Sequence, residues 1–394
     1  MADANQPKKA PEVAVTVAGN RLTLLADGPE RLEALIALIE GAKTSLRILY
    51  YMFLDDESGR KVRDALLAAS ERGVDVWVLI DGFGSDAATA SFFASLDHSR
   101  VHFRLFSARF GRRYLLRNHQ KLALADGERV IIGGFNISDE YFGTTESGAW
   151  RDLGLQVEGN SVDCLISYFD ALFAWARTPH GRIRELRKML QEYSDTSGKL
   201  HWLFGGPTRR LSPWARAVRR DMKEGRRIDL IAAYFAPSLG MLRRLGGIER
   251  RGGMARIVTA AKSDNNATIG AARSTYSWLL KRGADIYEYQ PTKLHTKLFV
   301  LDNVVHIGSA NFDMRSLFLN LEMMLRIDDE AFAEAMHRFV DGEIAQSRHI
   351  TWEVHRAQLS WVNRLKWSLS YFVVAVADYR ISRVLNFGAE GRGK

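Results

Sequence analysis

The sequence of 394 residues contains a single cysteine, Cys164. One thiol cannot form a disulfide within the chain, and it supplies no cysteine cluster for a zinc ion. A disulfide-stapled scaffold and a cysteine-based zinc protein are therefore excluded. We expect a core that holds without cross-links, which fits a reducing compartment.

Long apolar runs are also absent. No stretch reaches about 18 uninterrupted apolar residues, the length that indicates a membrane-spanning helix. The nearest run, residues 371–377, is too short to span a bilayer, and residues 1–13 are polar with no apolar segment typical of a signal peptide. We expect a cytoplasmic protein.

Acidic residues are in the minority. There are 55 Lys and Arg residues against 46 Asp and Glu, which gives a formal net charge of +9. This balance suits an anionic partner, either nucleic acid or an anionic lipid surface, without choosing between them. With 46% hydrophobic residues, the chain is long enough to bury a large core and to form two or more domains.

A short pattern occurs twice, with its histidines 176 residues apart. The first copy reads Asn118-His119-Gln120-Lys121, then Asp126 and Gly133-Gly134-Phe135-Asn136; the second reads Leu294-His295-Thr296-Lys297, then Asp302 and Gly308-Ser309-Ala310-Asn311. Apolar runs after each pair predict buried strands, so each histidine shares a face with its lysine. The aspartates have the other parity, at the strand end, where we expect them to hold the turn.

The duplication predicts one site assembled from two halves. An ammonium group beside each imidazole would repel a metal ion, and no carboxylate or cysteine recurs at metal-ligand spacing. Two histidines can instead divide phosphate chemistry, because one attacks phosphorus and the other protonates the leaving oxygen. Lys121 and Lys297 would hold the equatorial phosphate oxygens, so we expect neither metal nor cofactor.

Other residues of the two copies are candidates to support this site. Asn136 and Asn311 offer amide donors to phosphate oxygens, and Ser309 offers a hydroxyl to a phosphate or a carboxylate. A carboxylate is needed to fix the tautomer of each imidazole. Within their own repeats, Asp152 follows His119 by 33 residues and Glu322 follows His295 by 27, so these two are the matched candidates.

The remaining sequence repeats its order of elements. Strand-like runs alternate with helical patterns over residues 20–106, and the same order recurs over residues 228–289. This alternation indicates an α/β sheet covered on both faces, built by tandem duplication. We expect a disordered start at residues 1–19 and two halves at residues 20–200 and 201–350.

Residues 351–394 belong to neither half. Tryptophans and basic residues interleave there around an apolar stripe at helical spacing, as is typical of an amphipathic helix at a membrane interface. A helix that packs back onto the body is the alternative. We favour an anionic membrane surface as partner and place the protein peripherally on the inner face of the cell membrane.

These motifs resemble the phospholipase D superfamily, which is defined by paired His-x-Lys-x4-Asp motifs, and within it the bacterial cardiolipin synthases. The resemblance covers roughly residues 20–345 and includes both motif copies, Tyr50 to Gly59, Trp150-Arg151-Asp152, Tyr234 to Pro237 and Gly308 to Ser316. It implies a pseudo-twofold α/β/α sandwich and a phospholipid substrate. It also implies phosphatidyl transfer through His119 as nucleophile and His295 as acid and base, and it adds Asp126 and Asp302 to the catalytic set.

Three functions remain open from the sequence. The first is phosphatidyl transfer that makes cardiolipin, with phospholipase D hydrolysis as the same chemistry on water. The second is a metal-independent nuclease or other phosphodiesterase, which the basic charge permits and the aromatic tail disfavours, so we expect no nucleic acid partner. The third is a membrane-binding scaffold without catalysis, which the intact His, Lys and Asp residues in both copies make improbable.

Overall fold

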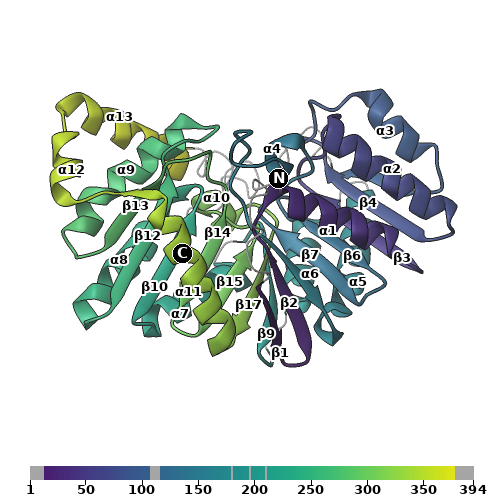
Figure 1. Cartoon of the computed structure of the whole chain (residues 1–394), viewed down its shortest axis with the longest axis horizontal. Helices are drawn as coiled ribbons and strands as arrows, with labels where there is room; N and C mark the ends of the chain where they lie inside the picture. Colours follow the sequence, from purple (N-terminus) through teal and green to yellow (C-terminus); the bar gives the residue numbers. More distant parts are fainter. Residues whose placement is uncertain (1–12, 107–115, 179–180, 195–196, 209–210, 378–394) are drawn as a thin grey trace, which may run out of the picture.

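The computed structural model describes residues 13–106, 116–178, 181–194, 197–208 and 211–377. Two eight-stranded sheets form the two halves of the molecule (Figure 1). Most strands are buried over most of their length, as the near-continuous apolar runs of the sequence predict. The fold is α/β, as expected.

The first sheet has the strand order β1-β2-β8-β7-β6-β3-β4-β5. Strands β3, β4 and β5 pair in parallel and the others pair antiparallel. The strands are β1 (Ala14–Val17), β2 (Asn20–Leu25), β3 (Ser45–Tyr50), β4 (Asp75–Asp81), β5 (His102–Phe106), β6 (Leu122–Ala125), β7 (Arg129–Gly133) and β8 (Gly154–Glu158).

The second sheet repeats this topology. Its order, β9-β17-β15-β14-β10-β12-β13-β18, matches β2-β8-β7-β6-β3-β4-β5 strand for strand and then adds β18. The pseudo-twofold tandem repeat is therefore confirmed. The strands are β9 (Leu200–Gly205), β10 (Arg227–Ala232), β12 (Met254–Ala260), β13 (Asp285–Tyr289), β14 (Lys297–Leu301), β15 (Val304–Gly308), β17 (Glu322–Asp328) and β18 (Ser347–His349), with a separate pair β11 (Phe235–Ala236) and β16 (Phe312–Asp313).

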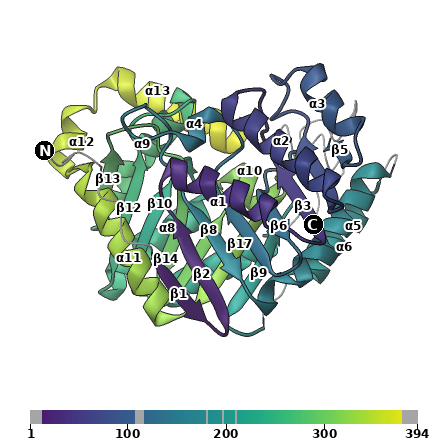
Figure 2. The ribbon, with the colours of Figure 1, turned by 45° about the vertical axis from the view of Figure 1, so that its right-hand side comes forward.

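Helices cover both faces of each sheet. The side chains of α1, α2 and α3 pack in one outer core on the first sheet, and those of α7, α8 and α9 pack in another on the second. Figure 2 shows the same arrangement after a turn. The helices are α1 (Gly28–Glu40), α2 (Glu57–Glu71), α3 (Ala90–Asp97), α4 (Asp139–Phe142), α5 (Cys164–Arg177), α6 (Ile183–Glu192), α7 (Pro213–Glu224), α8 (Leu239–Ile248), α9 (Asn266–Leu280), α10 (Met314–Phe318), α11 (Glu330–Ala345), α12 (Trp352–Ala357) and α13 (Trp361–Tyr371), with short turns η1 (Asn160–Val162), η2 (Glu249–Arg251) and η3 (Phe372–Ala377).

A third core joins the two halves. It combines inward side chains of both sheets with those of α5, α6 and α11, for example Leu124, Phe169, Val300 and Met336. Apolar side chains of both halves are therefore buried in one shared cluster.

The start of the chain corrects one expectation. Residues 14–17, which we assigned to a disordered segment, form β1 and pair with β2. The available signal was the alternation of valine with smaller or polar residues over residues 14–17, which is typical of a strand with one buried face. Val17 is indeed fully buried. Residues 1–12 lie outside the described residues, and the division of the chain at residue 200 remains an expectation.

The C-terminal segment packs on the second half along one side. Trp367 of α13 is buried and stacks on His355 of α12, and both helices lie against α9. Gly270 permits this approach, because a Cβ atom there would lie 2.5 Å from the Ser370 hydroxyl. The alternative of a helix that packs back onto the body therefore describes one side of α13, and the exposed apolar side leaves the membrane-interface role an expectation. Residues 378–394 of the expected tail are outside the described part.

Candidate active site

The two halves meet at their motif histidines. The backbone N–H of His119 donates to the carbonyl of Leu321 at 2.9 Å, and that of His295 donates to the carbonyl of Arg151 at 2.7 Å. The first bond connects the segment before β6 to the segment that enters β17. The second connects the segment before β14 to the segment that enters β8. One site is thus assembled from both repeats.

Each imidazole is held by a carboxylate from the opposite half. The Nδ1 atom of His119 lies 3.0 Å from Glu322, and the Nδ1 atom of His295 lies 2.6 Å from Asp152. The expectation that a carboxylate orients each histidine is confirmed. The pairing within one repeat was wrong, because the backbone bonds that cross between the halves place each carboxylate beside the other repeat's histidine.

These contacts fix the reactive nitrogen. A carboxylate accepts a hydrogen bond, so Nδ1 of His119 carries the proton and its Nε2 keeps a lone pair. At His295 the Lys297 Nζ atom also lies 2.8 Å from Nδ1, and the shorter contact of 2.6 Å with Asp152 assigns the proton to Nδ1 there too. No described residue forms a hydrogen bond with either Nε2 atom in this structure. Both rings therefore present a nitrogen that can attack an electrophile or carry a proton.

The two lysines stand in matching positions. The Lys121 ammonium donates to the carbonyl of His119 at 2.7 Å, and the Lys297 ammonium donates to the carbonyl of His295. Both side chains are buried. The Lys297 Nζ atom also lies 2.8 Å from His295 Nδ1, so this pair shares one side as predicted, whereas for His119 and Lys121 the sharing stays a prediction. The site contains two lysine side chains suited to an anionic substrate.

Burial controls the protonation of this cluster. Desolvation lowers the pKa of His119 to about 4, with Glu322 opposing the shift and Lys121 adding to it. Desolvation, then Lys297, lowers the pKa of His295 to about 4 against the pull of Asp152. Both imidazoles are consequently neutral at neutral pH before an anion binds.

The lysines respond in the same direction. Desolvation lowers the pKa of Lys297 to about 8, although Asp152 and Glu322 oppose it. Burial also lowers the pKa of Lys121 well below its usual value, and the charge of Lys297 contributes to that shift. Each lysine affects the other's titration, so the two half-sites form one electrostatic unit.

Aromatic rings enclose the histidines unequally. His295 touches the rings of Tyr141, Trp150 and Tyr234, with centroids 5.1, 5.4 and 6.4 Å away. His119 touches Tyr51 at 5.1 Å. We did not identify these aromatic residues as site residues, although Tyr51 and Tyr234 follow equivalent strands, β3 and β10, and that matched position was an available signal.

The carboxylates also differ in their partners. Glu322 accepts hydrogen bonds from the hydroxyls of Ser309 and Ser316, so Ser309 contacts a carboxylate as one of its two expected roles. No hydroxyl takes the equivalent place at Asp152, because a Cβ atom on Gly134 would lie 2.4 Å from Asp152 Oδ1. Ser316 is a further site residue that sequence reasoning did not single out.

The two motif asparagines are buried near the site. Asn136 accepts from the Met52 N–H at 3.2 Å and donates to the Tyr141 hydroxyl at 3.0 Å. These bonds hold the Tyr141 ring in its place beside His295. The side-chain carbonyl of Asn311 is buried and has no hydrogen-bond partner among the described residues. Their contact with a phosphate stays a prediction.

Asp126 and Asp302 do not belong to the catalytic cluster, which corrects their place in the expected set. They lie in the turns at the far ends of β6 and β14, each with a positive φ, of 56° and 49°. Asp126 accepts from the Thr44 and Ser45 N–H groups at 2.8 and 3.0 Å. Partial burial opposes, but these backbone donors lower its pKa to about 2.

Asp302 makes the equivalent contacts in the second half. It accepts from the N–H groups of Arg226 and Arg227, the latter at 2.8 Å. Each aspartate therefore ties the motif turn to the start of the neighbouring strand, β10 here and β3 in the first half. The turn-holding role that strand parity suggested is the one that the contacts describe.

Within the described residues, no three or more His, Cys, Asp or Glu side chains cluster so as to hold a metal ion. The donor set at the candidate site is two imidazoles, each beside an ammonium group. Those residues fit an anion.

Comparison with known proteins identifies the family. Residues 35–160 and 218–342 each match the family model described as Cardiolipin synthase, PLD-like domain. The chain belongs to this family. Among the curated relatives of this cardiolipin synthase family member, cardiolipin synthase A of Pseudomonas entomophila is 30% identical over 87% of this chain and 73% of its own. The major cardiolipin synthase ClsA of Bacillus subtilis is 30% identical over 91% of this chain and 75% of its own.

Solved structures support the fold. The phosphatidylserine synthase of Haemophilus influenzae superposes with a TM-score of 0.69 over 95% of this chain and 97% of its own, at 14% identity. A polyphosphate kinase from Porphyromonas gingivalis reaches 0.58 over 89% of this chain and 53% of its own, at 12% identity. The α/β/α architecture of the phospholipase D type is thereby shown.

Proposed function

We propose that this protein transfers a phosphatidyl group through a covalent phosphohistidine and makes cardiolipin from phosphatidylglycerol and a second phospholipid or alcohol. One observation carries the proposal: two imidazoles, each oriented by a carboxylate of the other half, share a buried site with two ammonium groups. The family and the curated relatives support the same substrate class.

The first step uses both histidines. Nε2 of His119 attacks phosphorus, a nitrogen–phosphorus bond forms, and the bond from phosphorus to the glycerol oxygen breaks. That oxygen takes the proton of the His295 imidazolium and leaves as free glycerol. A bound phosphodiester favours this imidazolium, because its negative charge offsets the nearby ammonium groups.

The second step reverses the proton transfer. His295 now takes the proton of an acceptor hydroxyl, whose oxygen attacks phosphorus while the bond to His119 breaks. Lys121 and Lys297 stabilise charge on the equatorial oxygens in both steps. Water as acceptor would give hydrolysis at the same residues.

The unequal carboxylates support this order of roles. Two serine hydroxyls share the charge of Glu322, which makes it a weaker partner for an imidazolium at His119. Asp152 has no hydroxyl donor and is better able to support an imidazolium at His295. A neutral His119 is the better nucleophile.

We further propose that the protein works on an anionic membrane surface. Six apolar side chains of α13 and η3 are exposed, and Trp361 is 77% exposed. Basic residues lie on the same helix, at Arg364 and Lys366. Figures 1 and 2 place α13 and α4, which follows the first motif, on the same, upper side of the molecule. No described helix has the length and apolar character needed to cross a membrane.

The experiment that tests the function separates the two histidines by leaving group. With phosphatidylglycerol, His119→Ala and His295→Ala should each lower turnover at least about 1,000-fold, since one half-site cannot supply both attack and protonation. With a short-chain p-nitrophenyl phosphodiester, whose leaving group needs no proton, His295→Ala should still release one equivalent of nitrophenol. His119→Ala should release none.

The products decide the remaining question. Labelled phosphatidylglycerol in micelles should yield cardiolipin and, with water as acceptor, phosphatidic acid. Peptide mass spectrometry of His295→Ala after the nitrophenyl reaction should find the phosphoryl adduct on His119. A nitrophenol burst with an adduct on His295 in the His119→Ala variant would reverse the roles, and wild-type protein that makes neither lipid product would contradict the proposed function.

A further inference from the structure

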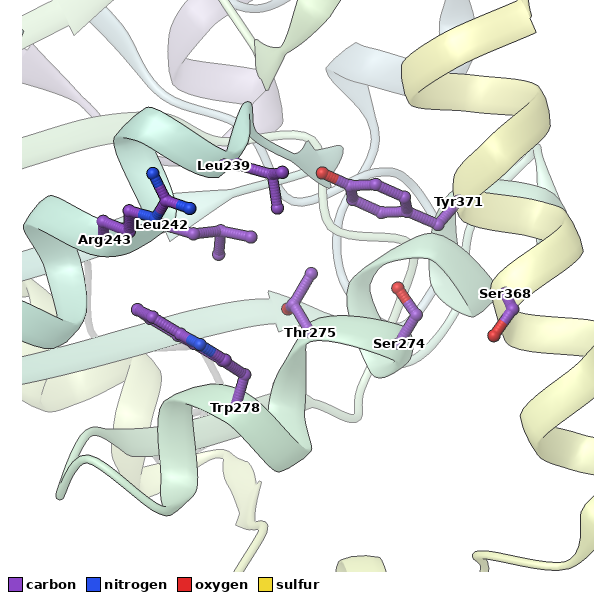
Figure 3. A pocket seen from close by; sticks show the side chains of 8 residues that line it. All are labelled: Leu239, Leu242, Arg243, Ser274, Thr275, Trp278, Ser368 and Tyr371. Atoms are coloured by element: carbon purple, nitrogen blue, oxygen red, sulfur yellow. The ribbon is translucent and has the colours of Figure 1, made fainter.

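A cavity lies between α8, α9 and α13, apart from the histidine site. Its volume is about 350 Å³, within the roughly 300–1,000 Å³ of small-ligand pockets. Figure 3 shows Tyr371 extending from α13 toward Leu239 of α8, with the Trp278 ring on the opposite side. The other lining residues are Leu242, Arg243, Ser274, Thr275 and Ser368.

The walls of this cavity are mainly apolar. Ser274 and Thr275 donate their hydroxyl protons to carbonyls of their own helix, at 2.7 Å in both cases, so their hydrogen-bonding needs are met internally. Leu239, Leu242 and Trp278 supply apolar surface. An alkyl chain therefore fits these walls better than a polar ligand does.

Gly246 allows the Trp278 side chain, which lines the cavity, to pack close to α8. Trp278 lies against α8 at Gly246, where a Cβ atom would come within 2.6 Å of the indole ring. The Arg282 guanidinium lies over the Trp278 ring, 3.7 Å from its centroid. The indole therefore contacts both α8 and a guanidinium group, and these contacts hold it as a wall of the cavity.

A cation stands at the rim. Arg243 is exposed, and no hydrogen bond or ion pair involves its side chain among the residues that the structure describes. Such a guanidinium suits a phosphate oxygen. The combination of an apolar cavity and a rim arginine is complementary to an amphiphile with a negative head group.

The cavity lies beside α13, and one short segment connects it to the active site. Leu239 at its mouth is 65% exposed. The Tyr371 hydroxyl donates to the carbonyl of Pro237 at 2.7 Å, and three residues earlier Tyr234 contacts His295. A lipid that enters beside α13 would thus sit next to the segment that lines the catalytic histidine.

We propose that this cavity binds one acyl chain of an anionic phospholipid, with the lipid phosphate at Arg243. The bound lipid is not the reacting one, because the reacting phosphorus must lie between the two imidazoles. It anchors the second half to the membrane beside the active site. The inference rests on the proposed action at a lipid surface.

Photo-crosslinking tests the proposal on the full-length protein. The probe is phosphatidylglycerol with a diazirine near the end of one acyl chain, in detergent micelles, with adducts mapped by peptide mass spectrometry. We expect adducts on residues 239–243 and 274–278 that unlabelled phosphatidylglycerol competes away. Arg243→Gln should lower them about threefold, as loss of an exposed ion pair does.

Matched variants make the result specific. Arg250→Gln removes the same charge outside the cavity and should leave the adducts unchanged. Ser274→Phe fills the cavity and should abolish them, while turnover of a short-chain soluble phosphodiester stays at the wild-type level. Adducts found only on residues 361–373, or equal labelling by a phosphatidylcholine probe, would overturn the proposal. Cavity adducts without any lipid turnover would support this site and contradict the proposed function.

Discussion

The two motif aspartates show that one sequence motif can contain residues suited to catalysis together with residues that hold the fold. Asp126 and Asp302 recur at the same spacing as the histidines, yet their carboxylates bind backbone N–H groups of the neighbouring strand. A recurrent spacing reports that a residue is needed in each half. It does not report whether the residue contacts substrate.

Asp126→Asn should therefore lower stability and spare chemistry. Asparagine tolerates the left-handed backbone of this turn but loses the charge that several N–H groups share, a loss of about 1 kcal/mol. Because the pKa of Asp126 is lowered to about 2, its contribution is present above about pH 4 and disappears as the pH falls through 2. Urea unfolding at pH 7 and at pH 3 measures this difference.

The matched variant Asp302→Asn occupies the equivalent turn and should behave in the same way. Turnover of a short-chain phosphodiester should stay within about twofold of wild type in both variants, since neither aspartate contacts the reacting groups. A large loss of turnover with unchanged stability would return these aspartates to the catalytic set.

Lys297 gives the site an alkaline limit. Its pKa is lowered to about 8, so the ammonium group is lost as the pH rises through that value. The inhibition constant of a short dialkyl phosphate, whose charge is constant over this range, should be level at pH 6–7.5 and weaken by up to about tenfold per pH unit above 8. Competition kinetics measure it.

Arginine provides the control for this limit. Lys297→Arg keeps its charge far above pH 8, so any binding that it retains should show a shallower alkaline decline, and the decline that remains belongs to Lys121, whose pKa burial also lowers. A wild-type inhibition constant that remains level to pH 9.5 would contradict the role of Lys297 as the titrating cation.

At the scale of the element, α13 has one side that packs on the protein and another that is apolar and exposed. Trp367 and Tyr371 fasten it to α9 and to Pro237, whereas Leu365 and Leu369 are exposed at 64% and 59%. The sequence predicted the amphipathic helix. It could not predict that one side packs on the protein, because the pairing surface on α9 includes a glycine far away in the chain, Gly270.

The double variant Leu365→Glu and Leu369→Glu should weaken binding to phosphatidylglycerol vesicles at least about tenfold. Burial of a leucine in the interface contributes about 1.5–3 kcal/mol, and each glutamate adds repulsion from the anionic surface. Vesicle flotation measures the binding. Gln191→Glu with Gln346→Glu adds the same charge elsewhere and should bind as wild type does. Equal binding of both double variants would contradict interface contact by α13.

The strands and most of the outer helices were largely predictable, but the inner helices α5, α6 and α11 and the outer helix α7 were not identified. The predictable elements have buried runs or clear helical spacing between turn residues, as at β2 (Asn20–Leu25), which begins where the alternating pattern of the sequence begins. The inner helices pack against the other half. Their apolar side chains are buried only when the two sheets pack together, so the local sequence pattern did not identify these helices.

At the scale of the whole molecule, the residues of the candidate site could be predicted, but the pairing of each carboxylate with its histidine could not. Two histidines and two lysines were identified from their duplication, and Asp152 and Glu322 from the need of an imidazole for a carboxylate. Which carboxylate serves which histidine depends on backbone bonds between the halves. No spacing along the chain encodes those bonds.

The shared inner core predicts cooperative unfolding. Side chains from both sheets, such as Leu124 and Val300, pack in one buried cluster, so neither half retains its core when the other unfolds. Differential scanning calorimetry should find one endotherm for the full chain, and Asp126→Asn in the first half should shift all of it. Two separable endotherms would indicate halves that fold independently.

The crossed carboxylates have a consequence for the ancestry of the chain. A lone repeat would hold a histidine and a lysine with no acidic partner for the ring, and it would become complete only by association with an identical copy. Joining two such copies in one polypeptide removed the requirement that they stay identical. The hydroxyl of Ser309 facing one acid, where Gly134 leaves the other bare, is a difference that a symmetric pair could never have acquired.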